Sequence, residues 1–352
     1  MPDNNNKSDN ISKKPNQKLD FNFDHPKIPT REIPRFTDLR KMEIPPKQQL
    51  IAPWLTEKSI SLISGWRGTG KTWFALSIID AVAHGKPFGP WQTGKPVPCL
   101  YLDGELPIED VKERLYYIGA GVNNQNSPYI YSNDYETSKG YPKASLYNKD
   151  WCNEMRNILI SLGIKLWVID NLASLAGGLD ENTKKDWDPI NSWLLDLRFS
   201  GISTIMLQNT SKSGVQRGTS AREDNLDISI ILDRPSDYKR TDGCRFITKF
   251  TKNRVRTEDL GLIEDTEFNL IRNASGIYEW EYNKPTCKNS STKKCGIIKA
   301  ISDGTIKKDI AHEFKVTPTY VSKIGKSAIK DGYLNSDYSL TKKGVEYLET
   351  EV

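Results

Sequence analysis

The stretch SISLISGWRGTGKT, residues 59–72, decides the fold of this chain. Its first six residues form a short run rich in isoleucine and serine that predicts a buried strand, and residues 71–83 predict a helix. Between them, Gly65, Gly70, Lys71 and Thr72 fit the pattern G-x-x-x-x-G-K-[S/T] at every required position. Because a strand leads in and a helix leads out, residues 65–72 predict a phosphate-binding loop.

This loop has the chemistry needed to hold ATP and Mg²⁺, which we expect as cofactors. Its glycines permit a tight turn whose backbone N–H groups point at the phosphates. The Lys71 side chain would place a positive charge on the β and γ oxygens, and the Thr72 hydroxyl would ligate Mg²⁺. The residues expected to bind ATP are Gly65, Trp66, Arg67, Gly68, Thr69, Gly70, Lys71 and Thr72.

Short apolar runs alternate with helical patterns beyond the loop. Further strands are predicted at residues 99–103, 166–170, 203–209, 228–232 and 244–250, and helices at 150–162, at 183–197 and from about Pro107. Residues 266–270 and 276–282 predict a closing antiparallel hairpin. Strands that alternate with helices favour an α/β fold with a mostly parallel sheet covered on both faces.

Two carboxylates follow strands that should end beside the loop. Asp170 ends the strand at 166–170, where a carboxylate would hold the Mg²⁺ shell. Glu105 follows the strand at 99–103 and would orient water in line with the γ-phosphate. Asp103, two residues earlier, is the alternative for that role. Alternatively, Glu105 is a carboxylate near a helix N-terminus that only interacts favourably with the helix dipole.

The composition excludes several classes of protein. The hydrophobic fraction is 37% and the charged fraction 27%, as in soluble globular proteins. No apolar run approaches the roughly 18 residues of a membrane span, and the N-terminus lacks the apolar core of a secretory signal. The five cysteines are scattered, and none pairs with histidine at metal-ligand spacing. These features argue against zinc and favour a reducing cytoplasm.

Four segments are expected along the chain. Residues 1–45 are polar, without helical or strand period, and are expected to be disordered. Residues 46–283 would form the core, residues 284–292 a linker, and residues 293–352 a terminal module. Residues 1–50 carry ten basic against seven acidic residues, and the chain from Lys284 onward carries thirteen lysines against eight acids. This basic excess on the flanks suggests a polyanionic partner.

The sequence of the terminal module predicts a small winged helix-turn-helix domain. Helices are expected at residues 293–302, at 305–314 with Thr305 opening the helix, and from Pro318, with Thr317 as its N-cap. A small hairpin at 333–340 and a closing helix at 340–349 would follow. The spacing of Lys323, Lys326 and Lys330 places them on one face of the third helix, where they would bind DNA. The alternative is a protein-binding winged helix with ordinary surface lysines.

Six motifs occur in order between residues 50 and 282: GWRGTGKT, YLDGELP, LWVIDNLASL, IMLQNTSKSG, QRGTSAREDNLD and KFTKNR. In these the chain resembles the RepA-like replicative helicases of plasmids and, more widely, the RecA-like AAA family ATPases of the RecA and DnaB superfamily. The resemblance implies a RecA-like P-loop core and a homo-oligomer, a hexameric ring, that hydrolyses ATP between subunits. It also implies movement along single-stranded DNA in replication of a plasmid or mobile element, with an initiator or primase as partner.

The resemblance further implies roles for individual residues. Glu105 would be the catalytic base and Gln208 the sensor of the γ-phosphate, although many RepA-like relatives carry His-His where this chain has Gln208 and Asn209. The residues that would act on a neighbour's ATP are Arg217, Lys252 and Arg254, and Lys212 would lie in the DNA-facing loop. The alternatives are a loop arginine that contacts DNA phosphate for Arg217, and a solvated strand face for Lys252 and Arg254.

Two other functions remain open from the sequence. One is a DNA-linked regulatory or assembly ATPase that does not unwind DNA. The other is a recombination-type ATPase that coats DNA as a filament.

Overall fold

The computed structural model describes residues 33–119, 126–177, 184–210, 225–285, 290–314 and 316–350. The chain divides into two compact units, residues 1–46 and 47–352. In the first unit, residues 36–39 form the short helix α1 (Phe36–Leu39), in which no residue is buried. The sequence predicted no regular structure here, so this single helical turn differs from the expectation. Residues 1–32 lie outside the described residues.

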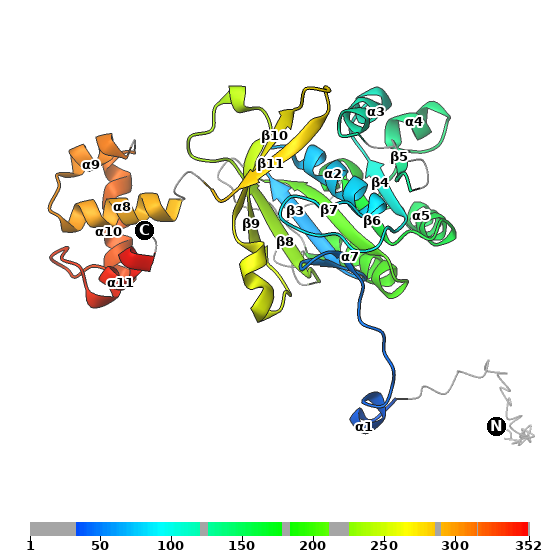
Figure 1. Cartoon of the computed structure of the whole chain (residues 1–352), viewed down its shortest axis with the longest axis horizontal. Helices are drawn as coiled ribbons and strands as arrows, with labels where there is room; N and C mark the ends of the chain where they lie inside the picture. The colour runs from blue at the N-terminus through cyan, green and yellow to red at the C-terminus, as the bar shows by residue number, and fades with distance from the viewer. Residues whose placement is uncertain are drawn as a thin grey trace, which may run out of the picture. The chain divides into compact units, whose positions relative to one another are not determined.

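A nine-stranded sheet, counted over the described residues, forms the centre of the second unit (Figure 1). Its strand order is β11-β10-β9-β8-β3-β7-β6-β4-β5. The strands are β3 (Ile60–Gly65), β4 (Cys99–Asp103), β5 (Tyr129–Ser132), β6 (Leu166–Asp170), β7 (Ser203–Asn209), β8 (Ile228–Asp233), β9 (Arg245–Lys252), β10 (Thr266–Arg272) and β11 (Tyr278–Asn283). The six strands from β8 to β5 are parallel, and β9, β10 and β11 each run antiparallel to their neighbours.

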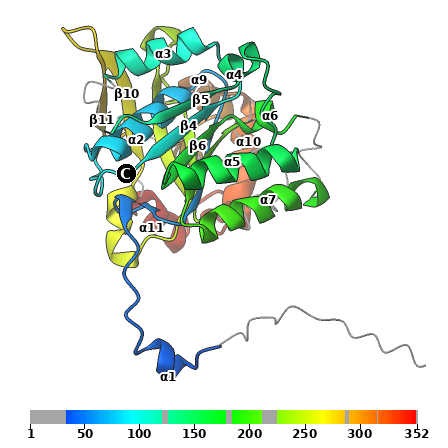
Figure 2. The same cartoon turned by 90° about the vertical axis from the view of Figure 1, so that its right-hand side faces the viewer.

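Helices cover both faces of this sheet. The helix α2 (Lys71–His84) and the small hairpin of β1 (Gln49–Ile51) and β2 (Leu55–Thr56) belong to one buried cluster. The helices α5 (Lys149–Ser161) and α7 (Lys184–Phe199) bury their apolar residues in a second cluster against the opposite face, and they lie side by side in Figure 2. The expected α/β fold with a mostly parallel sheet covered on both faces is thus confirmed. Among the described helices, none is both long enough and apolar enough to cross a membrane.

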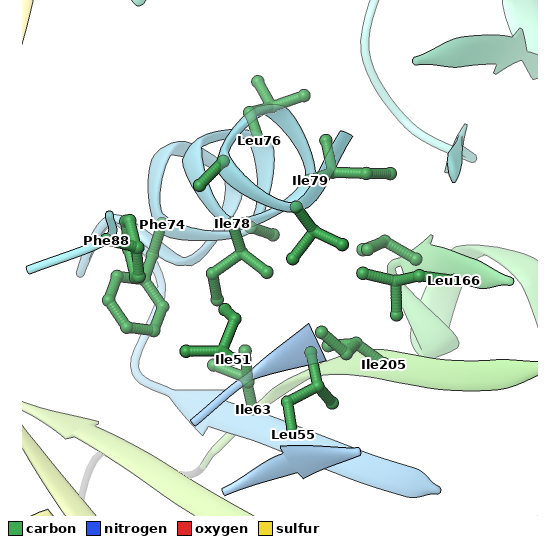
Figure 3. Packing of buried hydrophobic residues seen from close by; sticks show 14 of the residues in the cluster. Ile51, Leu55, Ile63, Phe74, Leu76, Ile78, Ile79, Phe88, Leu166 and Ile205 are labelled. Atoms are coloured by element: carbon green, nitrogen blue, oxygen red, sulfur yellow. The ribbon is translucent and has the colours of Figure 1, made fainter. Parts of the chain in front are cut away.

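Packing of α2 fixes the loop that precedes it. Ile78 points from α2 toward Ile51 of β1 and Ile63 of β3, and Ile79 lies on the side of α2 nearer to Leu166 of β6 (Figure 3). All five side chains are fully buried, and each contributes about 1.5–3 kcal/mol relative to an exposed side chain. The start of α2 is therefore held against the carboxyl edge of the central strands.

Most of the predicted elements coincide with observed ones. The strands β4, β6 and β7 have the predicted bounds, and β10 and β11 form the expected antiparallel hairpin. Pro107 is the N-cap of α3 (Ile108–Tyr117). The elements that the sequence did not predict include α1, β1, β2, β5 and the short helices α4 (Asn133–Ser138) and α6 (Leu172–Leu175).

The terminal module has a hydrophobic core of its own, centred on Ile297, Ile310 and Val321. Its elements are α8 (Ser290–Ser302), α9 (Lys307–Glu313), α10 (Pro318–Lys330), an isolated bridge between Leu334 and Leu340, and α11 (Lys342–Thr350). Thr317 caps α10 as expected, because its hydroxyl accepts a hydrogen bond from the Tyr320 N–H at 3.2 Å. Thr305 does not open α9, whose N-cap is Ile306. The winged helix-turn-helix identity of this module stays a prediction.

Candidate active site

The carboxyl ends of the parallel strands meet around one cavity of about 740 Å³. The loop after β3, the turn after β4 and the end of β6 all open into it. This is where a parallel α/β sheet places its ligand site, and the volume suits a small-molecule ligand. The cavity is lined by Arg67, Gly68, Gly70, Lys71, Thr72, Trp73, Asp103, Glu105, Leu106, Arg114, Asp170, Asn171, Ala173, Ser174, Asn209, Gly243 and Cys244.

The glycine-rich loop has the tight backbone that its composition predicted. Gly70 is the N-cap of α2 with φ of 112°, a left-handed conformation that favours glycine. A Cβ at Gly70 would lie 2.1 Å from Cys244 Sγ, so a larger residue does not fit. The buried Thr69 hydroxyl donates to the Trp66 carbonyl at 2.6 Å and closes the turn. The loop thus turns tightly into the N-terminus of α2, whose first residues, Lys71 and Thr72, line the cavity.

Lys71 is buried in this loop. Its ammonium donates to the carbonyls of Gly65 at 3.0 Å and Trp66 at 3.1 Å. Burial lowers the pKa of Lys71 to about 8, while the charges of Asp170 and Glu105 act in the opposite direction. A phosphate group would give this ammonium a charged acceptor in place of neutral carbonyls.

Thr72 and Asp170 meet as the sequence predicted. The Thr72 hydroxyl donates to Asp170 Oδ2 at 2.7 Å. Burial raises the pKa of Asp170, and the hydrogen bonds from Thr72 and Tyr101 oppose that rise. A hydroxyl and a carboxylate at the mouth of a phosphate loop are the oxygen donors that Mg²⁺ prefers. The residues present therefore fit a magnesium ion held with a nucleotide.

The two acidic residues of the turn after β4 differ in their surroundings. Asp103 is buried, and its Oδ1 accepts hydrogen bonds from the Glu105 N–H at 2.9 Å and the Leu106 N–H at 2.6 Å. Burial raises the pKa of Asp103 to about 6. Glu105 is exposed at the cavity wall. Asp103 thus shapes the turn that presents Glu105, and the choice of Glu105 as the base stays a prediction.

Asn171 is a site residue that the sequence did not predict. Its Nδ2 donates to Glu105 Oε2, and its Oδ1 accepts from the Ser174 N–H at 3.1 Å, which makes it the N-cap of α6 (Leu172–Leu175). The Gly104 N–H also donates to the Asp170 carbonyl at 2.7 Å. These bonds tie the turn that carries Glu105 to the end of β6.

Arg114 of α3 is a second residue that sequence reasoning missed. It lines the cavity, and its guanidinium lies over the Trp73 ring, 5.5 Å from the ring centroid. Its position nine residues after Glu105 carries no local motif, so only the packing of α3 against α2 could place it in the site. Tyr101, which donates to Asp170 Oδ2 at 2.6 Å, was also missed.

The residues implied by the family resemblance lie mostly outside this cavity. Gln208 is buried on β7 in register with Ser64, and its neighbour Asn209 lines the cavity instead. Lys252, the last residue of β9, pairs in register with Ser229 near the start of β8, and thus at the edge of the sheet opposite the loop. Arg254 lies beyond the end of β9 rather than on it, and its Nε contacts Asp227 Oδ1 at 3.1 Å.

Five predicted residues remain, two of them outside the described residues and three on α10. Lys212 and Arg217 lie outside the described residues. Lys323, Lys326 and Lys330 are exposed along α10, as their spacing predicted.

Solved structures similar to this chain include two that each cover about two thirds of it. One is a KaiC-like protein from the hyperthermophilic archaeon Pyrococcus horikoshii OT3, with 17% identity and a TM-score of 0.45 over 65% of this chain and 93% of that chain. Another is a separately solved ATPase domain, with 13% identity and a TM-score of 0.46 over 63% of this chain and 84% of that one. Among curated protein sequences, none matches this chain.

The family model matches a long stretch of the sequence. The model of the AAA domain family AAA_25 matches residues 28–215. This range covers more than half of the 352 residues and contains the phosphate loop, Glu105, Asp170 and Gln208. The chain therefore belongs to the AAA domain family AAA_25.

Proposed function

We propose that this chain is an ATPase that hydrolyses ATP with Mg²⁺ and works as a ring-forming DNA helicase or translocase. The observation that carries the ATPase proposal is one cavity lined by Lys71, Thr72, Asp170 and Glu105. The Thr72–Asp170 hydrogen bond adds the hydroxyl–carboxylate pair that a nucleotide-bound Mg²⁺ requires.

The geometry suggests how each residue would act. The N-terminus of α2 and the loop N–H groups would hold the phosphates, and Lys71 would move from the loop carbonyls to the phosphate oxygens. Magnesium, held through Thr72 and Asp170, would neutralise charge on the β and γ oxygens. Glu105, positioned by Asn171, would accept the proton of a water aligned with the γ-phosphate.

A role for Lys252 and Arg254 in ATP hydrolysis would require an oligomer. Both lie at the far edge of the sheet from the chain's own loop, so they could contact ATP only across a subunit interface. Arg254 has a side chain that is 63% exposed although it pairs with Asp227, which leaves it accessible to a neighbour. A ring of subunits would give each cavity such a neighbour.

The DNA part of the proposal depends on charge. The exposed lysines of α10 and the basic excess after Lys284 suit a phosphate backbone. The terminal module holds no arginine, so it lacks the planar guanidinium that suits bidentate contact with guanine. We therefore expect binding that depends little on sequence.

Strand displacement on forked DNA tests the motor directly. We expect the wild-type chain with ATP and Mg²⁺ to displace a strand, and Lys71→Ala to lose nucleotide binding and displacement together. Hydrolysis without any strand movement would instead indicate a regulatory or assembly ATPase, in particular if single-stranded DNA leaves the rate unchanged. Open helical assemblies in electron micrographs would indicate a filament-forming recombination ATPase.

A further inference from the structure

We propose that Tyr101 is a positioning residue for magnesium, acting through the carboxylate of Asp170. The inference rests on the proposed binding of ATP with Mg²⁺. It concerns a buried hydroxyl on the strand next to β6, which does not line the nucleotide cavity.

Tyr101 contacts Asp170 from the neighbouring strand β4. It lies in the middle of β4, is fully buried, and is in register with Val168 of the neighbouring strand β6. From there its hydroxyl donates to Asp170 Oδ2 at 2.6 Å. Because Tyr101 is fully buried, its hydroxyl cannot turn toward water in place of Asp170.

The same carboxylate oxygen accepts a second hydrogen bond. Thr72 donates to Asp170 Oδ2 at 2.7 Å, so two hydroxyl donors converge on one oxygen. A Thr72 hydroxyl that gives its hydrogen to Asp170 keeps its lone pairs for a metal ion. The pair of donors also leaves Oδ1 as the carboxylate oxygen available to the water shell of that ion.

Tyr101 therefore determines which way the Asp170 carboxylate faces. A buried carboxylate held by one donor alone can rotate about its last side-chain bond, and a carboxylate that rotates no longer orients Thr72 or the metal shell. Partners that hydrogen-bond to metal-binding side chains typically contribute about 10- to 100-fold in metal affinity. Without its hydroxyl, the ring of Tyr101 would still fill the same part of the core.

The substitution Tyr101→Phe separates these two roles, because it removes the hydroxyl and keeps the ring. Tyr131→Phe is a matched control. Tyr131 lies on the adjacent strand β5 in register with Leu102, and its hydroxyl contacts Trp151 Nε1 at 3.4 Å. It makes no contact with Asp170 in the described structure.

The measurement is binding of a fluorescent, slowly hydrolysed ATP analogue to the full chain, titrated with MgCl₂ and repeated in excess chelator. For Tyr101→Phe we expect the half-saturating Mg²⁺ concentration to rise by about tenfold or more. Affinity for the analogue in chelator should stay within about twofold of wild type, and thermal unfolding of the apo chain should be cooperative. Tyr131→Phe should change neither quantity.

Three outcomes are distinguishable. An unchanged Mg²⁺ requirement in Tyr101→Phe overturns the proposal. Equal weakening with and without Mg²⁺ also overturns it, because Tyr101 would then support the fold of the loop and have no specific link to the metal. If the wild-type chain binds no nucleotide under any condition, the proposed function fails before the role of Tyr101 is tested.

Discussion

At the scale of single residues, the position of each acidic side chain on the backbone decides what it can do. Asp103 is the last residue of β4 and is buried. Its side chain accepts hydrogen bonds from two backbone N–H groups of the following turn. Glu105 lies two residues later on that turn and faces the cavity. Both carboxylates line the cavity, but Asp103 is buried and bound to the backbone of the turn, whereas Glu105 is exposed. We therefore expect the two to have separate tasks.

Replacing each acid by its amide should separate them. In Glu105→Gln we expect ATP turnover to fall by about 10²- to 10⁴-fold, because the group that accepts the proton is lost, while nucleotide binding is kept. In Asp103→Asn the Oδ1 acceptor remains, so turnover should stay within a few-fold of wild type. Steady-state hydrolysis together with binding of an ATP analogue checks both variants. Loss of turnover in Asp103→Asn but not in Glu105→Gln would transfer the role of base to Asp103.

Asp103 should also make stability depend on pH. Burial raises its pKa in the folded chain to about 6, from 3.8 for the free group, so the folded state binds this proton more tightly than the unfolded state does. The neutral form thus stabilises the fold below about pH 4, and that contribution is lost as the pH rises through about 6. Relative to Asp103→Asn, wild type should lose up to about 3 kcal/mol between these values.

Urea unfolding of both proteins at several pH values, without nucleotide, checks this sign. The free energy of unfolding of Asp103→Asn should exceed that of wild type increasingly toward neutral pH. A difference that is constant with pH would mean that Asp103 titrates normally.

At the scale of elements, the phosphate loop is a local feature, and its conformation depends on Gly70. Gly70 needs both a left-handed backbone and space beside Cys244. Gly163, between α5 and β6, has φ of 65° but no atom within 4 Å of the position of a Cβ. A substitution at Gly163 therefore reports backbone strain alone, whereas one at Gly70 reports backbone strain together with a steric clash.

We expect Gly163→Ala to destabilise the chain by about 1–2 kcal/mol, the cost of a left-handed alanine. Gly70→Ala should destabilise it further and abolish nucleotide binding, because the added Cβ would lie 2.1 Å from Cys244 Sγ. Thermal unfolding and analogue binding measure both effects. Adding Cys244→Ala to Gly70→Ala should recover part of the stability. Equal losses in the two single variants would show that Cys244 does not limit this position.

Elements with a local signal were predicted, and those defined by distant partners were not. The strands β4, β6 and β7 are continuous apolar runs buried in the sheet, so their bounds could be read from the sequence. By contrast, β5 is a four-residue strand at the sheet edge with mixed exposure. Its pairing with β4 depends on tertiary contacts that no periodicity records.

The same distinction holds within the site. Lys71 and Thr72 follow from a motif of eight residues, and Asp170 from its place at the end of a strand. Tyr101 reaches Asp170 only through the neighbouring positions of β4 and β6 in the sheet, and Arg114 reaches the cavity only through the packing of α3. Contacts between residues 69 positions apart in the chain have no local pattern by which they could be found.

At the scale of the whole molecule, charge and nucleotide chemistry lie on different parts of the chain. The cavity lies at the carboxyl edge of the sheet, whereas thirteen lysines follow residue 283. Exposed lysines suit phosphate contact without base recognition, and such contact weakens steeply with salt. The dependence of DNA binding on salt therefore reports how many of these lysines take part.

The three exposed lysines of α10 should contribute a measurable part of the salt dependence of DNA binding. We expect Lys323→Ala, Lys326→Ala and Lys330→Ala, combined in the full chain, to weaken binding to single-stranded DNA. The slope of log affinity against log salt should fall by up to about 2, since each phosphate contact on a single strand contributes about 0.7. Fluorescence anisotropy at several salt concentrations gives this slope.

A charge-matched control shows whether position or net charge matters. Lys58, Lys149 and Lys165 are also exposed but lie outside the terminal module, so replacing all three by alanine removes the same charge elsewhere. If α10 contacts DNA, the control variant keeps the wild-type slope while the α10 variant loses part of it. An equal fall of the slope in both variants would mean that net charge, and not the position of the lysines, determines the salt dependence. A wild-type slope in both would favour a protein partner for this face of α10, because exposed lysines that bind no phosphate leave the salt dependence unaltered.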